Sequence, residues 1–147
     1  GTFNSGDWNS GDRNSGDRNS GDRNSGDRNS GNSNSGDSNS GLFNSTNYSS
    51  GIFCNEEPKV KIFNIETDMT MSEFEKTKYY DVLVFAGFKL TEQDSKNDKL
   101  IEYSYKDACR NWWKELTKKE KEIVLDLPNF NWEVFTDITG IKKEELW

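Results

Sequence analysis

Hydrophobic and polar positions divide the chain into two parts with different patterns. Residues 1–54 hold nearly all of the glycine and serine, whereas residues 55–147 hold most of the Ile, Leu and Val and four of the five Trp. Polar residues of the first part recur with a period of five, and apolar residues of the second part recur at helical spacing. We therefore expect a repeat tract at 1–54 and a mainly helical C-terminal cap at 55–147.

The first part consists of eleven consecutive five-residue units in one phase, most of which read Gly-x-x-Asn-Ser. Arginine holds the third position in the middle of the tract, and aromatic residues hold it toward both ends. A strict period is typical of a solenoid, whereas a flexible Gly/Ser linker needs none. An unstructured product of recent DNA expansion is the alternative. Because Gly1 is already in phase with the repeat, we expect further repeats upstream of it.

The tandem Asn-x-Gly-x-x pattern resembles the second type of pentapeptide-repeat protein over residues 1–54. The resemblance implies a β-solenoid, a right-handed quadrilateral β-helix with four pentapeptides in each coil. Residues i and i+20 would then stack roughly 4.8 Å apart. The third-position residues would form four columns: Phe3–Arg23–Phe43, Trp8–Arg28–Tyr48, Arg13–Ser33–Phe53 and Arg18–Ser38.

Charge also favours a four-sided coil over a three-sided one. No arginine stacks on another in four-sided columns, whereas three pentapeptides per coil would place Arg13 under Arg28. Burial of unpaired arginines is prohibitive, so the third position should point outward, and Asn and Gly should line a narrow interior. We expect the Asn amides to form ladders between coils. The candidate interaction surface comprises Phe3, Trp8, Arg13, Arg18, Arg23, Arg28, Phe43 and Tyr48.

The second part reads as one short strand followed by helices. The strand, near Val60 to Ile65, could extend the last coil. Capping boxes predict helix starts at Ser72/Glu75 and at Thr117/Glu120, and Gly140 predicts a helix end. Another helix has Tyr105, Ala108, Trp112 and Leu116 on one face, and the pattern of residues 82–90 fits a strand or a helix. Residues 91–99 read as a polar loop.

This part resembles the tail that follows such repeats in uncharacterised phage and prophage proteins. The matching stretches are GIFCNEEPKVKIFN and LDLPNFNWEVFTDITGI. The resemblance brings no enzymatic activity with it. Adjacent Trp112 and Trp113 are expected in the core rather than on a binding surface. Lys118, Lys119 and Lys121 alternate with Glu, which indicates a solvated helix face rather than an anion site.

The remaining composition argues against catalysis and against nucleic-acid binding. The chain has no His, and its two cysteines, Cys54 and Cys109, lack metal-site spacing, which is typical of reduced thiols in a cytoplasmic protein. We find no catalytic motif, signal peptide or membrane span. The net charge is −7 at pH 7 without a basic stripe. We therefore expect no enzyme, cofactor, metal site, membrane contact or direct nucleic-acid contact.

Two functions fit these expectations. One is a rigid, non-enzymatic interaction scaffold of a phage or mobile element that binds a protein partner and could inhibit a host or defence protein. The other is a structural rod that self-assembles through end-to-end stacking of the solenoid. Mimicry of DNA, which some pentapeptide-repeat proteins use against topoisomerases, is disfavoured because Asp alternates with Arg in the middle of the tract.

Overall fold

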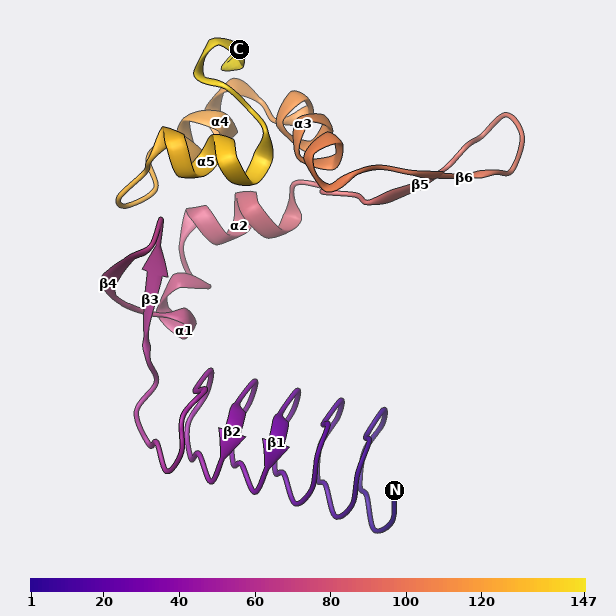
Figure 1. Ribbon diagram of the computed structural model, residues 1–147, viewed down its shortest axis with the longest axis vertical. Coiled ribbons are helices and arrows are strands. Elements are labelled where there is room, and N and C mark those ends of the chain that lie inside the picture. The colour runs from indigo at the N-terminus through magenta and orange to yellow at the C-terminus, as the bar shows by residue number, and fades with distance from the viewer. The chain divides into compact units, whose positions relative to one another are not determined.

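The computed structural model describes residues 1–147, and the chain divides into two compact units (Figure 1). The first unit is Gly1–Lys59 and the second is Val60–Trp147. The repeat tract lies in the first unit, and every α-helix lies in the second. The expectation that the second unit caps the tract stays a prediction.

The repeat tract turns once every ten residues. Isolated parallel bridges join Ser5 to Ser15 and Ser15 to Ser25, and strand β1 (Ser30–Asn32) pairs in parallel with β2 (Ser40–Leu42), with Ser30 opposite Ser40. The expected coil of four pentapeptides is therefore wrong, because two pentapeptides complete a turn. Regular strand is limited to β1 and β2, and Figure 1 shows the tract as a row of stacked turns. The structure thus does not reproduce the quadrilateral β-helix.

Every backbone N–H of the three pentapeptides in residues 16–30 has a hydrogen-bond acceptor in a neighbouring turn. In each of these units three acceptors are carbonyl oxygens and two are side-chain oxygens of Asp or Asn, which explains why the repeat uses these residue types. In unit 16–20 the donors and acceptors are Gly16 to Ser5 O (2.9 Å), Asp17 to Asp27 Oδ1 (2.8 Å), Arg18 to Asp7 O (2.9 Å), Asn19 to Asn9 Oδ1 (3.0 Å) and Ser20 to Asn29 O (2.8 Å).

The interior of the tract is a ladder of asparagine side chains. Asn24 Oδ1 accepts from the backbone N–H of Asn34 at 3.1 Å and from Asn34 Nδ2 at 3.2 Å. Asn24 Nδ2 donates to Asn14 Oδ1 at 3.2 Å and to the carbonyl oxygen of Gly31 at 2.8 Å. The predicted inward asparagines and amide ladder are confirmed, with the rungs ten residues apart. Seven members are buried: Asn14, Asn19, Asn24, Asn29, Asn34, Asn39 and Asn44.

The asparagine ladder ends where Ser49 and Cys54 occupy the fourth position of their units. Their backbone N–H groups still donate to Asn39 Oδ1 at 3.0 Å and to Asn44 Oδ1 at 3.1 Å. Neither side chain carries an amide that could extend the ladder by another rung. The change of residue type at this position therefore marks the end of the polar interior.

The second unit begins with a β-hairpin. Strand β3 (Lys59–Ile62) pairs with β4 (Ile65–Thr70), and Phe63 and Asn64 connect them with φ of 49° and 68°. Two consecutive positive φ angles are the signature of the tight turn that suits the twist of a hairpin. The predicted strand, which could have extended the last coil, is confirmed, and its partner in a two-stranded sheet is β4.

Two short helices follow the hairpin. Helix α1 (Met71–Phe74) has a capping box of Thr70 and Glu73, so the predicted box at Ser72 and Glu75 is two residues out of place. Thr77 then caps a separate helix, α2 (Lys78–Phe85). The pattern of residues 82–90 fits a strand or a helix, and the first four of these residues lie in α2. The expected polar loop at 91–99 contains β5 (Thr91–Gln93), which pairs antiparallel with β6 (Leu100–Glu102).

The C-terminal helices follow the predicted signals more closely. Helix α3 is Tyr105–Glu115, α4 is Lys118–Leu125 and α5 is Trp132–Thr139, followed by a short 3-10 helix at Lys143–Glu145. The capping box of Thr117 and Glu120 is confirmed, and so is the left-handed Gly140 that ends α5.

Aromatic and aliphatic side chains form the core of the second unit. Trp112 and Trp113 are buried, as predicted, and Trp113 meets Phe135 edge to face with ring centroids 5.5 Å apart. Ala108, Trp112 and Leu116 of the predicted helix face are buried, whereas Tyr105 at its start is exposed. Lys118 and Lys119 are exposed, as expected of a solvated face. The expectation is wrong for Lys121, which is only 9% exposed, with its Nζ 5.5 Å from the ring centroid of Trp113.

Candidate functional site

The third-position residues of the repeat form two exposed columns. Because a turn has ten residues, each column takes one residue from every turn, and the two columns lie half a turn apart, on opposite sides of the tract. The expectation of four columns is therefore wrong, because residues ten apart stack and the third positions fall into two columns. Column one is Phe3, Arg13, Arg23, Ser33, Phe43 and Phe53; column two is Trp8, Arg18, Arg28, Ser38 and Tyr48.

A left-handed backbone turns each third-position side chain outward. All eleven of these residues have φ between 55° and 61°. This conformation strains β-branched residues most, and no Val, Ile or Thr occupies the position. The eight residues of the predicted interaction surface therefore share one backbone geometry, but the structure divides them between two sides.

Arginine lies next to arginine in both columns, contrary to the expected spacing. Arg13 and Arg23 are consecutive in column one, and Arg18 and Arg28 are consecutive in column two. Phe3 contacts Arg13 rather than Arg23, with the guanidinium carbon 5.7 Å from the ring centroid. The charge argument for four sides fails because exposed like charges are screened by solvent and salt.

The aspartates beside the arginines are engaged elsewhere. Each accepts a hydrogen bond from a backbone N–H one turn earlier, such as Asp22 Oδ1 from Asp12 at 2.9 Å. The N–H of Thr2 likewise lowers the pKa of the Asp12 carboxyl, which burial partly offsets. No ion pair involves the four arginines of the tract. Their guanidinium groups are therefore available to a partner.

Aromatic side chains stand at both ends of the columns. Phe3 is 81% exposed and Trp8 is 83% exposed. At the other end Phe43 and Phe53 stack with ring centroids 5.0 Å apart and an interplanar angle of 9°. This one-turn contact is further support for the ten-residue period. Each column thus has an aromatic ring directly before its arginine pair and another after one intervening serine. Arginine and aromatic side chains are both enriched in protein interfaces.

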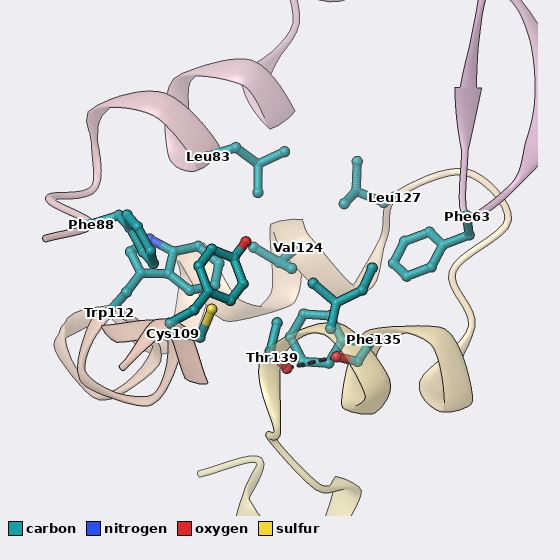
Figure 2. Close-up of a pocket in the computed structure, with 11 residues that line it drawn as sticks. Phe63, Leu83, Phe88, Cys109, Trp112, Val124, Leu127, Phe135 and Thr139 are labelled. Atoms are coloured by element: carbon teal, nitrogen blue, oxygen red, sulfur yellow. Dashed lines mark hydrogen bonds between the residues drawn. The ribbon is translucent and has the colours of Figure 1, made fainter. Parts of the chain in front are cut away.

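A cavity of about 370 Å³ lies within the second unit (Figure 2). Its residues come from the β3–β4 turn, helices α2 to α5 and the segment after α2, so it forms only when these elements pack together. Figure 2 shows the labelled side chains around a common space. The lining comprises Phe63, Leu83, Phe88, Tyr105, Cys109, Trp112, Val124, Leu127, Phe135, Ile138 and Thr139.

Three polar groups interrupt the apolar lining of this cavity. Burial raises the pKa of the Cys109 thiol, and burial with the neighbouring Cys109 raises the pKa of Tyr105. The Thr139 hydroxyl donates to the carbonyl oxygen of Phe135 at 2.7 Å. All three groups are therefore neutral near pH 7. The cavity could not be predicted from the sequence, because no local pattern links residues that lie 76 positions apart, as Phe63 and Thr139 do.

No group of three or more His, Cys, Asp or Glu side chains has a geometry that could hold a metal ion. No helix is both long enough and apolar enough to cross a membrane.

Comparison with known proteins gives one match. The family model of pentapeptide repeats, in eight copies, matches residues 1–32. No curated protein and no solved structure matches the chain. Residues 1–32 are therefore similar to pentapeptide repeats, and this part of the chain holds all four column arginines.

Proposed function

We propose that the chain is a non-enzymatic interaction scaffold whose repeat tract binds a protein partner through the two columns. The observation that carries the proposal is the set of four exposed arginines without ion pairs, each on a backbone fixed by hydrogen bonds to neighbouring turns. A rigid backbone lowers the entropy cost of binding. The resemblance of the tail supports an origin in a phage or mobile element, where the partner would be a host or defence protein.

Mimicry of duplex DNA fits the structure poorly. Eleven units at two per turn give five and a half turns, or about 26 Å at roughly 4.8 Å per turn. A duplex of that length carries about 15 negative charges. The tract has six Asp and four Arg, a net charge of −2. A partner that recognises arginine and aromatic side chains is therefore favoured over one that recognises a polyanion.

Affinity capture tests the scaffold. The full chain and the Arg23→Ser/Arg28→Ser variant would each be immobilised, exposed to host lysate and compared by quantitative mass spectrometry. Lys96→Ser/Lys99→Ser is the matched control, since it removes the same charge from exposed positions of the second unit. We expect a specific partner to be lost from the arginine variant and kept by the control. Equal recovery by both variants would contradict a role for the columns.

The uniform hydrogen-bond pattern of successive turns favours a second candidate, a structural rod. An exposed turn presents donors and acceptors at the spacing that another turn requires, so copies could stack end to end. Light scattering over a range of protein concentrations distinguishes the two functions. A rod grows with concentration, whereas an interaction scaffold keeps a discrete size.

A further inference from the structure

The cavity of the second unit has the size and composition of a ligand site. Pockets for small molecules typically enclose about 300–1,000 Å³ and are lined by apolar and aromatic side chains with a few polar groups. The cavity here encloses about 370 Å³ and has this kind of lining. Close packing leaves few voids of such size in a protein interior, and an apolar void gains from an apolar occupant.

The lining divides into a buried floor and an exposed mouth. The floor consists of six residues that are 2–8% exposed: Cys109, Trp112, Val124, Leu127, Phe135 and Thr139. Leu83, Phe88, Tyr105 and Ile138 are 37–55% exposed and form the mouth. A molecule can therefore enter from solvent between α2 and the other helices without unfolding the core.

The chemistry of the lining restricts the charge of the occupant. None of the lining residues is charged at neutral pH. An ion placed there would lose its hydration without gaining a charged partner, which is costly. The Tyr105 hydroxyl and the Cys109 thiol can each exchange a hydrogen bond with a small polar group. Aromatic rings of Trp112 and Phe135 suit a flat apolar body.

We propose that this cavity is a binding site for a small, uncharged molecule with an aromatic body. The site is separate from the columns of the repeat tract, so the proposal does not rest on the scaffold function. The molecule lies against Trp112 and Phe135, and its body replaces solvent in the cavity.

A fluorescent probe of this chemistry tests the site in the full chain. N-phenyl-1-naphthylamine is neutral, has a flat two-ring body, and becomes fluorescent in apolar surroundings. We expect saturable binding of one probe per chain. 1-Anilinonaphthalene-8-sulfonate carries a similar body with a negative charge and should bind at least tenfold more weakly. Absence of saturable binding of the neutral probe, or equal binding of both probes, would overturn the proposal.

Neighbouring residues of α2 supply a variant and its control. Leu83→Trp fills the mouth, whereas Val84→Trp adds the same ring to an exposed position of the same helix outside the lining. We expect the Kd of the neutral probe to rise at least tenfold in Leu83→Trp and to change less than twofold in Val84→Trp. Equal effects would show that the probe binds exposed apolar surface instead. If circular dichroism shows that Leu83→Trp does not fold, Ile138→Trp on α5 gives the same comparison.

Discussion

The two units are stabilised by different kinds of buried side chain, polar in the repeat tract and mainly apolar in the second unit. In the repeat tract the buried side chains are asparagines and one serine, and backbone and side-chain hydrogen bonds connect every turn to the next. In the second unit the buried set is mainly aliphatic and aromatic, centred on Trp112, Trp113 and Phe135. Hydrogen bonds are directional and packing is not, so the tract demands Asn at its buried position, whereas the second unit accepts mixed apolar side chains.

This difference explains why one part of the sequence is periodic and the other is not. The asparagine ladder needs the same donor and acceptor at the same position of every turn. Replacement of one asparagine removes hydrogen bonds from buried polar groups of the neighbouring turns. A core of mixed apolar side chains needs suitable volumes and shapes, which many sequences provide. Strict repetition is therefore the sequence signature of the polar interior.

The largest expected effect is the loss of the tract in Gly21→Val. Gly21 has φ of 110°, and a β-carbon at this position would collide with the carbonyl oxygen of Gly31 in the next turn. Ser20→Val changes an exposed neighbour and is the control. We expect rapid proteolysis within residues 11–31 of the glycine variant and native resistance in the control. Equal resistance of both variants would contradict the close approach of the turns.

Phe135→Ala should destabilise the second unit alone. Truncation of a buried phenylalanine costs about 3–5 kcal/mol, and Phe135 packs against Trp113 and Phe130 in the core. Urea unfolding followed by tryptophan fluorescence measures the loss, with the exposed Phe85→Ala as control. Amide hydrogen exchange in residues 11–45 should remain unchanged. Faster exchange there would show that the tract depends on the second core.

Asn24→Ala should weaken the tract by about 2–4 kcal/mol, because it leaves buried donors and acceptors of neighbouring turns without partners. The N–H of Asn34 and the carbonyl oxygen of Gly31 each lose a hydrogen bond to the side chain of residue 24. Asn14 Oδ1 loses one of two donors and keeps the backbone N–H of residue 24. Ser25→Ala, at an exposed position, should stay within about 0.5 kcal/mol of the wild type. Amide exchange of the neighbouring turns gives the free energy of opening. Equal values for the two variants would disprove the ladder as the stabilising element.

The smallest expected effect is a loss of stability of the second unit at alkaline pH. Burial raises the pKa of Cys109 above its ordinary 9.0, so the fold favours the neutral thiol. This contribution is fully present below about pH 9 and is lost as pH rises through the higher pKa of the folded state. The urea concentration at the unfolding midpoint should be lower above pH 9 than at pH 8, and this decrease should be smaller in Cys109→Ala. Cys54→Ala, the control, should keep the full decrease.

Much of the structure of the repeat tract could be predicted because the five-residue period is visible directly in the sequence. The inward asparagines, their ladder and the outward arginines all follow from the cost of burying charge and the pairing of amides. The number of residues per turn could not be obtained in this way. A five-residue phase fits turns of ten, fifteen or twenty residues, and the separation of arginines favoured the wrong one because exposed like charges cost little.

In the second unit, features set by local sequence, such as helix ends, could be predicted, whereas features set by the packing of distant elements could not. Thr117 and Gly140 act within one helical turn, so their roles were clear from sequence. Ser72 and Glu75 fit a capping box equally well, but α1 begins earlier, at Met71, and its N-cap is Thr70, the last residue of β4. The cavity depends on the mutual placement of a hairpin and four helices, and no periodic pattern in the sequence encodes that placement.

The ten-residue turn is tested most directly by disulfide formation between paired serines. Ser15 and Ser25 are bridge partners on consecutive turns, whereas Ser15 and Ser35 are two turns apart, about 10 Å in this structure at roughly 4.8 Å per turn. A disulfide requires Cα atoms within about 7 Å. In a chain with Cys54 and Cys109 replaced by Ser, we predict rapid oxidation of Ser15→Cys/Ser25→Cys and none of Ser15→Cys/Ser35→Cys under native conditions. The reverse result would contradict the ten-residue turn and restore the coil of four pentapeptides.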